Sequence, residues 1–120
     1  MYTIPFQTID WDQIETIEYK GTTGTAYWQT VVLDGLRIRK VIYSDNYKAD
    51  HWCQKGHIVY CLEGEFSSEL ENGETYKLTQ GMIYIVSDDL SSHSSITANK
   101  VTLLIIDGSF LKPKEQEFSI

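Results

Sequence analysis

The stretch Asp50-His51-Trp52-Cys53-Gln54-Lys55-Gly56-His57-Ile58-Val59-Tyr60-Cys61-Leu62-Glu63-Gly64-Glu65 organises the rest of this 120-residue chain. It contains both cysteines and two of the three histidines. His51 and Cys53 are two residues apart, so their side chains point the same way on an extended strand. Lys55-Gly56 favours a turn, and His57 then opens an apolar run of strand length. Two neighbouring strands arranged in this way bring three metal-binding side chains close together.

The third histidine, His93, lies far away in the sequence, after a polar loop at residues 87–92. A fold that curls the chain round would add it to the other three as a fourth metal ligand. A single histidine is more often a surface residue or a satisfied core residue. The spacing His-x-Cys-x3-His and the matching strand-end position of His93 favour a shared metal site instead.

The composition indicates one domain and argues against two classes of partner. With 42% hydrophobic residues, the chain has enough apolar material for a single core. Its 17 acidic residues outnumber 10 basic residues, giving a formal charge of -7. Because the basic residues are also scattered, nucleic acid and anionic membranes are poor candidates as partners.

The sequence carries neither a secretory signal nor a membrane helix. The N-terminal residues lack a basic segment followed by an apolar run, and no stretch approaches roughly 18 consecutive apolar residues. We therefore expect a soluble cytoplasmic protein. In that reducing compartment Cys53 and Cys61 are expected to be free thiols, with a disulfide between them as the less favoured alternative.

Short runs rich in β-branched and aromatic residues, separated by turn signals, cover most of the chain. Asp34-Gly35 predicts a hairpin with a type I′ turn, and Asn72-Gly73 predicts a second hairpin. Asp10 is placed to cap one helical turn, and the run 82–86 is apolar enough to be buried on both faces. Nine or ten strands are expected in total, including those at residues 15–19, 26–33, 36–44, 58–62, 66–70, 75–78, 82–86 and 101–106.

Regular short strands of this kind favour an antiparallel sandwich or a closed barrel. Closure of the barrel also removes the exposed edges that so many strands would otherwise present. We predict an all-β single domain over residues 1–120. Its barrel core spans about residues 15–107, with a peripheral N-terminal segment, 1–14, and a peripheral C-terminal tail, 108–120.

The spacing of the site residues resembles the first sequence motif of the cupins, which are small double-sheet β-barrels with a metal inside. That motif has the form Gly-x5-His-x-His-x3 or x4-Glu-x6-Gly. The chain keeps every interval from His51 through Cys53 and His57 to Gly64. Cys53 replaces the second histidine of the motif and His57 replaces its glutamate, while Asp45 stands where the motif begins with glycine.

The second cupin motif, Gly-x5-Pro-x-Gly-x2-His-x3-Asn, is matched at its ends by Gly81 and His93. His93 comes one residue late, and the positions of Pro, Gly and Asn hold Ser87, Asp89 and Thr97. More narrowly, the run Asp-His-Trp-Cys at residues 50–53 is similar to a group of small bacterial cupins named for Asp, His, Cys and Trp, the DHCW group.

The resemblance implies a cupin-type double-stranded β-helix, or jelly-roll barrel, whose metal is held by His51, Cys53, His57 and His93. Three imidazoles and a thiolate are a softer set of ligands than the usual cupin set of three His and one Glu. This difference favours Zn over Mn or Fe, with Fe(II), Ni or Cu as open alternatives. Members of the superfamily often form dimers, so a homodimer is also expected.

The favoured functional hypothesis is a metal-dependent enzyme that acts on a small polar molecule in the barrel. The alternatives are a non-catalytic metal-dependent module that binds or senses a small molecule, and a metal that only stabilises the fold. Asp50 is expected to orient a ligand imidazole and Trp52 to pack outside the barrel. The candidate pocket residues are Arg37, Arg39, Tyr27, Tyr43, Tyr60 and Tyr84.

Overall fold

Residues 3–112, which the structure, a computed structural model, describes, form nine strands and two short 3-10 helices. The strands are β1 (Thr16–Lys20), β2 (Thr25–Leu33), β3 (Leu36–Tyr43), β4 (His57–Glu63), β5 (Glu65–Leu70), β6 (Thr75–Thr79), β7 (Ile83–Val86), β8 (His93–Ile96) and β9 (Val101–Gly108). The helices are η1 (Trp11–Gln13) and η2 (Ser109–Leu111), and neither is long and apolar enough to cross a membrane. The rest of the predicted tail, residues 113–120, lies outside the described residues.

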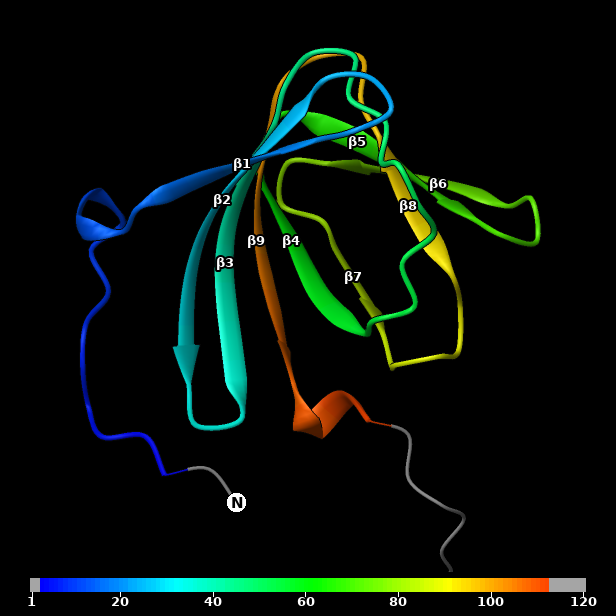
Figure 1. The fold of residues 1–120 in the computed structure, drawn as a ribbon. Coiled ribbons are helices and arrows are strands. Elements are labelled where there is room, and N and C mark those ends of the chain that lie inside the picture. Colours follow the sequence, from blue (N-terminus) through cyan, green and yellow to red (C-terminus); the bar gives the residue numbers. More distant parts are fainter. Residues whose placement is uncertain (1–2, 113–120) are drawn as a thin grey trace, which may run out of the picture.

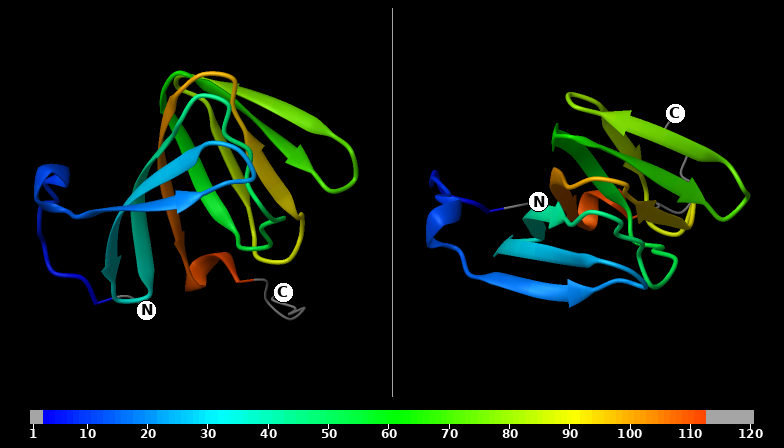
Figure 2. Two further views of the ribbon diagram at one scale, coloured as in Figure 1. Left: turned by 45° about the horizontal axis from the view of Figure 1, so that its top comes forward. Right: turned by 90° about the horizontal axis from the view of Figure 1, so that it is seen from above.

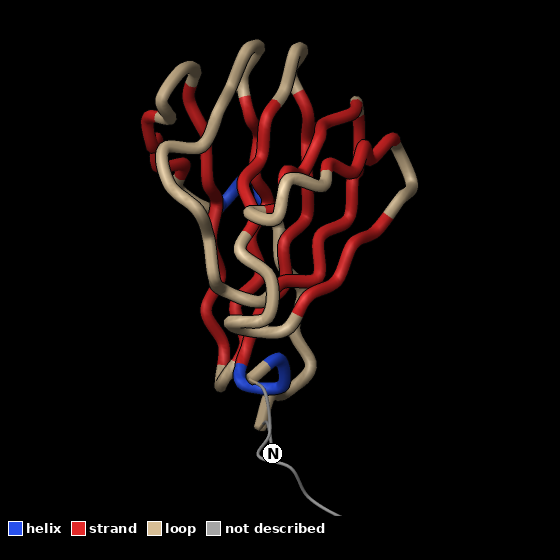
Figure 3. Tube along the Cα trace, turned by 90° about the vertical axis from the view of Figure 1, so that its right-hand side faces the viewer, coloured by secondary structure: helices blue, strands red, loops and turns tan. Residues whose placement is uncertain are grey.

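The strands pair into two antiparallel sheets, which confirms the predicted all-β jelly roll. The large sheet has the order β1-β2-β3-β9-β4-β7 and the small sheet the order β6-β5-β8. Figure 1 shows the β1–β2 pair and the β5–β6 pair on opposite sides of the molecule, and both views of Figure 2 agree. Strands dominate the trace in Figure 3, where helices are confined to short segments.

The predicted local signals are confirmed in three places, with one difference in turn type. Asp10 caps η1, because its carboxylate accepts a hydrogen bond from the backbone N–H of Asp12. Asn72-Gly73 lies in the loop between the paired strands β5 and β6, and Asp34-Gly35 connects β2 to β3 with Leu33 opposite Leu36. A type I′ turn requires positive φ at both central residues. Only Gly35, at 69°, has one, so the predicted turn type is wrong.

The apolar core lies on the inward face of β3, β9 and β4. Val41 is opposite Leu103, and Leu103 is opposite Cys61, so these three side chains form one buried row across the strands. Alternate positions of a strand share a face, which explains why the buried residues are two apart. The other core residues are Ala26, Tyr43, Tyr47, Val59, Phe66, Leu78, Val101 and Ile105.

The same face becomes polar toward one end of these strands. Arg37 is opposite Asp107, and Ile58 is opposite Ile106, so His57 and Asp107 are the next residues of β4 and β9. Arg39, Asp107 and His57 are all buried, with 4%, 2% and 6% of their surface exposed. Charged groups are rarely buried unless they are paired, so this end of the barrel is organised around specific polar contacts.

Two strands differ from the sequence prediction. The prediction that the run 82–86 is buried on both faces is wrong, because β7 is the edge strand of the large sheet and Ile83 and Ile85 are 58% and 66% exposed. The sequence also does not predict β8, because His93-Ser94-Ser95-Ile96 has little apolar character. Pairing with β5 makes this segment a strand, so tertiary contacts override its local preference.

Candidate metal centre

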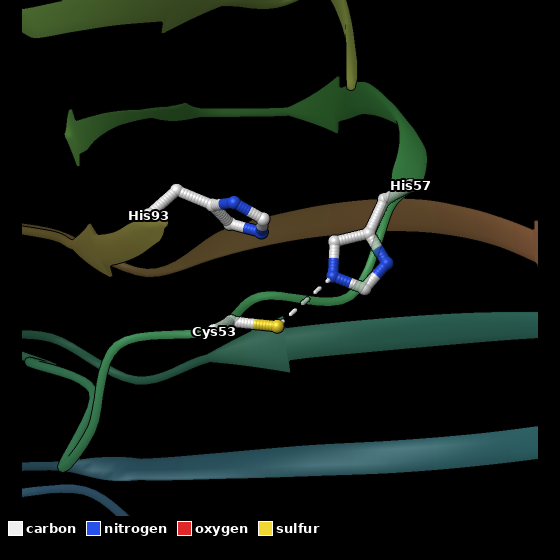
Figure 4. Close-up of side chains that lie close together, drawn as sticks. All are labelled: Cys53, His57 and His93. Atoms are coloured by element: carbon white, nitrogen blue, oxygen red, sulfur yellow. Dashed lines mark hydrogen bonds between the residues drawn. The ribbon is translucent and has the colours of Figure 1, made fainter. Parts of the chain in front are cut away.

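Cys53 and His93 are brought together by backbone pairing. Each donates its backbone N–H to the carbonyl oxygen of the other, at 2.8 and 3.0 Å, so they form an isolated bridge beside β8. Directly opposite residues joined by two such bonds have Cα atoms about 5.5 Å apart, which places their side chains in reach of one ion. His57, the first residue of β4, completes a cluster in which all three side chains point toward one another (Figure 4).

Gly56 allows the loop between Cys53 and His57 to pass close to the end of β7. A Cβ atom at Gly56 would lie 2.6 Å from both the carbonyl oxygen of Val86 and the backbone nitrogen of Asp88. The backbone N–H of Gly56 also donates to the carboxylate of Asp88 at 2.6 Å. Only a residue without a side chain fits this approach, which positions His57 against Cys53.

The three ligand atoms have the spacing of a metal site. The sulfur of Cys53 is 3.4 Å from Nε2 of His57, and the ligand atoms of Cys53, His57 and His93 all lie within 4.8 Å of one another. In a tetrahedral zinc site with Zn–S near 2.3 Å and Zn–N near 2.05 Å, a sulfur and a nitrogen are about 3.5 Å apart. Cys53 and His57 therefore already have this spacing, and the ligand atom of His93 lies within 4.8 Å of both.

Hydrogen bonds on the far side of each imidazole leave Nε2 available for a metal. Nδ1 of His93 is 2.9 Å from the carbonyl oxygen of Ser91, which can only accept, so Nδ1 carries the proton. Nε2 of His93 is buried and has no hydrogen-bond partner among the described residues. Nδ1 of His57 likewise donates to Asp107, at 3.2 Å. Metal-binding histidines usually have this kind of partner on the second ring nitrogen.

Asp107 connects His57 to two arginines. Its Oδ1 accepts from Nε of Arg37 at 3.0 Å, and its Oδ2 accepts from Nη2 of Arg37 at 2.9 Å and from Nη2 of Arg39 at 3.0 Å. Burial by itself would raise the pKa of Asp107, but its bonds to His57 and Arg37 hold that pKa well below its ordinary value. Asp107 therefore remains a carboxylate and can only accept the proton of His57 Nδ1.

The two imidazoles stabilise the thiolate of Cys53. Burial would raise the pKa of this thiol, but its hydrogen bond with His57 and the nearby imidazole of His93 outweigh burial and lower it to about 5. Burial likewise tends to lower the pKa of His93, but the nearby Cys53 sulfur and the hydrogen bond to the carbonyl of Ser91 raise it above the ordinary value. Because thiolate is the form of cysteine that binds metals, the cluster is prepared for a cation near neutral pH.

His51 is not part of this cluster. Its side chain is 75% exposed, and its Nδ1 lies 2.6 Å from the carboxylate of Asp50, so Asp50 contacts an imidazole outside the cluster rather than the expected ligand imidazole. The strand alternation used to place His51 beside Cys53 does not apply, because residues 50–56 contain only an isolated bridge. Trp52 is 45% exposed, in keeping with a position outside the barrel.

A cavity of about 170 Å³ contains the cluster. Four of the six candidate pocket residues line it, namely Arg37, Arg39, Tyr43 and Tyr84. Tyr27 and Tyr60 do not, and Tyr60 lies on the more exposed face of β4. A second hollow of about 240 Å³ shares His93 and Tyr84 but neither Cys53 nor His57, so the smaller cavity is the candidate site.

Several residues of the site escape sequence reasoning, and three of them bear on its chemistry. Trp28 and Tyr47 line the cavity, and Asp107 bonds to His57 behind it. The signal for Asp107 is the alternation of Arg37 and Arg39 on one face of a strand. If that face is inward, the two guanidinium groups require a buried carboxylate, and Asp107 ends the most apolar strand of the chain. Trp28 and Tyr47 carry no signal that separates them from other aromatic core residues.

Comparison with known proteins identifies the fold. No family model and no curated protein matches the sequence. Among solved structures, ectoine synthase from P. lautus is 20% identical, with 84% of this chain and 76% of that chain covered and a TM-score of 0.69. An RmlC-like cupin from Shewanella frigidimarina is 18% identical, with 87% and 91% covered and a TM-score of 0.69. A "predicted oxalate decarboxylase" from Thermotoga maritima is 14% identical, with 85% and 99% covered and a TM-score of 0.71. At these identities the likeness concerns the fold, and on that evidence the chain has the single-domain jelly roll of the cupins.

Proposed function

We propose that Cys53, His57 and His93 bind a divalent metal ion, and that the protein is a metal-dependent enzyme acting on a small polar molecule in the barrel cavity. The observation that carries this proposal is the arrangement of one sulfur and two imidazole nitrogens within 4.8 Å of one another in a cavity. Structural zinc sites use four protein ligands, whereas catalytic zinc sites use three and leave a position for water or substrate. A three-residue cluster without His51 supports the catalytic alternative over a fold-stabilising metal.

Zinc is the preferred metal because the ligand set includes a thiolate. One thiolate with two imidazoles suits Zn, while Fe(II), Ni and Cu also accept imidazole and remain alternatives. When bound, such a metal would act as a Lewis acid or lower the pKa of a bound water molecule. The names of the similar solved structures, which include a synthase and a predicted decarboxylase, support an enzyme of small molecules.

The protein's own residues supply orientation and a shielded cavity. Asp107 holds the ring of His57 with Nε2 toward Cys53, and Ser91 does the same for His93 through its carbonyl oxygen. Tyr43 and Tyr47 stack with ring centroids 4.3 Å apart and line the same cavity. An aromatic wall of this kind lowers the local polarity and strengthens electrostatic interactions inside the site.

Elemental analysis of untagged protein, purified without added metal, tests the metal centre. We expect about one zinc per chain in the wild type, and loss of most of that zinc in His57→Ala and Cys53→Ser. His51→Ala is the matched control, because it removes an imidazole from the same segment but outside the cluster, and it should retain zinc. Loss of zinc in His51→Ala equal to that in His57→Ala would favour the four-ligand site and a structural metal.

A second candidate function uses the same residues without a metal. Cys53, His57 and Asp107 form a chain of contacts, with 3.4 Å from Sγ to Nε2 and 3.2 Å from Nδ1 to Oδ2. A thiolate activated by a carboxylate-oriented imidazole is the arrangement of cysteine nucleophiles. Metal-free protein whose zinc affinity is too weak to measure, with full alkylation of Cys53 by iodoacetamide, would favour this candidate over the metal-dependent enzyme.

The non-catalytic alternative, a module that binds or senses a small molecule, shares the metal centre and differs only in turnover. We also propose a homodimer and a cytoplasmic location. The exposed edge of β7, with Ile83 and Ile85, supports self-association, and two free thiols agree with a reducing compartment. Sedimentation equilibrium with Ile85→Lys as the test variant checks the dimer, which this charge should dissociate.

A further inference from the structure

The lining of the cavity is electropositive, although the whole chain is acidic. Its described lining residues include the three cations Arg37, Arg39 and Lys55 but no aspartate or glutamate, so that the thiolate of Cys53 is the one anionic group among them. The complete chain has 17 acidic and 10 basic residues. A pocket that gathers cations in a chain with this composition favours an anionic ligand, because like charges otherwise repel one another at short range.

Asp107 does not neutralise the two arginines that it contacts. One carboxylate accepts two bonds from Arg37, one from Arg39 and one from His57. Burial lowers the pKa of Arg39, and the charge of Arg37 lowers it further. Two guanidinium groups therefore share one carboxylate, which leaves an excess of positive charge beside the cavity.

Two buried N–H donors of the cavity lining have no acceptor. Nε of Arg39 and Nε1 of Trp28 are fully buried and make no hydrogen bond to any described residue. The guanidinium carbon of Arg39 is 4.4 Å from the centroid of the Trp28 ring, so the two donors belong to adjacent groups. This cation–π contact offsets part of the charge of Arg39. The contact does not satisfy the indole N–H, because the N–H bond lies in the plane of the ring whereas the guanidinium lies over its face.

Unsatisfied buried donors are uncommon and costly. Each one has lost its hydrogen bond to water without gaining another, and most buried polar groups in native structures have a partner. Two adjacent unsatisfied donors in the lining of a cavity therefore indicate an acceptor that enters with a ligand. The volume of about 170 Å³ lies below the 300–1,000 Å³ range of pockets for drug-sized molecules, which limits the ligand to a few heavy atoms.

We propose that the cavity binds a small carboxylate, whose oxygens accept hydrogen bonds from Nε of Arg39 and Nε1 of Trp28. A small carboxylate would be the substrate class of the proposed enzyme. The proposal rests on that proposed function in one respect, which is that the remainder of the bound molecule lies beside Cys53, His57 and His93. Two N–H donors match the two oxygens of a carboxylate. An inorganic phosphate or phosphate ester presents more oxygens and is usually held by several backbone N–H groups or a helix N-terminus.

Binding is measured by titration with propanoate, its neutral counterpart propanamide, and inorganic phosphate. Isothermal titration calorimetry gives the dissociation constants, and the indole N–H resonance of Trp28 reports where the ligand binds. That resonance is identified as the one missing from the spectrum of Trp28→Phe. Propanoate should shift it and bind at least about tenfold more tightly than propanamide, because a charge-assisted hydrogen bond contributes about 1.5–3 kcal/mol.

Three variants test the two donors. Trp28→Phe removes the indole N–H but keeps an aromatic ring, and Arg39→Lys keeps the charge but removes Nε. Each should weaken propanoate binding about tenfold and propanamide binding by a smaller factor, because the amide offers one neutral oxygen where the carboxylate offers two charged ones. The matched control is Trp52→Phe, since Trp52 lies outside the cavity lining, and it should bind propanoate as the wild type does. Thermal unfolding identifies variants that are folded at the titration temperature, and Trp28→Phe alone suffices if Arg39→Lys is not.

Titrations of zinc-loaded and chelator-treated protein separate this proposal from the metal centre. Dependence of propanoate binding on Trp28 and Arg39 in chelator-treated protein supports the carboxylate site, whatever the zinc content proves to be. Equal affinities for propanoate and propanamide, unchanged affinity in both variants, or phosphate binding tenfold more tightly than propanoate would each overturn it. An absence of any shift in the Trp28 resonance at saturating propanoate would do the same.

Discussion

Two rows of side chains, on one face of the same three strands, have opposite character. The row Val41, Leu103 and Cys61 is apolar and forms the centre of the core. Two alternations further along, the row Arg37, Asp107 and His57 is charged and hydrogen-bonded. The strands, their pairing and their burial are continuous between the two rows, so backbone structure does not explain the difference.

The difference shows that the barrel keeps its apolar core and its reactive polar groups at different positions along the same strands. Burial in the apolar row raises the pKa of Cys61 and keeps its thiol neutral. In the polar region, the hydrogen bond with His57 and the nearby imidazole of His93 overcome burial and lower the pKa of Cys53 to about 5. The same residue type is thus a neutral core group beside the apolar row and an ionised group beside His57 of the polar row, because of the partners that each region provides.

The largest expected effect is on the polar row. Asp107→Asn keeps the shape of the side chain but leaves Arg37 and Arg39 without a counter-charge, which should lower the free energy of unfolding by about 3–5 kcal/mol. Urea denaturation followed by circular dichroism measures this change. The control is Asp12→Asn on the exposed helix η1, where a change within about 0.5 kcal/mol is expected. If Asp107→Asn lowers the free energy of unfolding no more than the control does, ion pairing does not stabilise this row.

Substitution in the apolar row should lower the free energy of unfolding nearly as much, but it should not change metal binding. Leu103→Ala leaves a cavity in the core and should lower the free energy of unfolding by about 2–5 kcal/mol. Zinc content per folded chain should stay at the wild-type level, because Leu103 is opposite Cys61, four residues along β4 from His57, and does not line the cavity of the cluster. Urea denaturation and elemental analysis of the same sample check both statements. A zinc loss as large as in His57→Ala would contradict the separation of the two rows.

The two thiols should differ in chemical reactivity. In metal-free protein near pH 7, Cys53 is mainly thiolate and partly exposed, whereas Cys61 is neutral and fully buried. We expect iodoacetamide to alkylate Cys53 at least about tenfold faster than Cys61, as measured by mass spectrometry of peptides. Zinc should protect Cys53. Equal rates in folded protein would show that the imidazoles do not stabilise the thiolate.

The smallest expected effect is the dependence of stability on pH. The pKa of Cys53 is lower in the folded protein than its ordinary value of 9.0, so its ionisation stabilises the fold fully above pH 9 and not at all below about pH 5. The stability difference between metal-free wild type and Cys53→Ser should therefore shrink as the pH falls from 7 to 4.5. Cys61→Ser is the control, because Cys61 is neutral throughout this range. Parallel pH profiles for the two variants would count against the thiolate.

The sequence predicts the barrel because strand periodicity and turn residues are local properties. Alternating runs and the pairs Asp34-Gly35 and Asn72-Gly73 are sufficient to place most of the strands. They fail at β7, whose apolar residues do not reveal that it is an edge strand, and at β8, whose polar residues form a strand only beside β5. The order of strands in a sheet depends on long-range pairing, which no local pattern reports.

The sequence by itself determined that this chain is an all-β barrel with His and Cys side chains at the ends of strands, because those features depend on residue type and spacing. Only the tertiary structure decided which of them meet. It pairs Cys53 with His93 at the β8 edge of the small sheet, leaves His51 exposed, and places Asp107 behind His57 across fifty residues of sequence. The physical reason is that a metal centre or a buried charge pair requires short distances between particular side chains. Strand pairing between segments far apart in the sequence determines those distances.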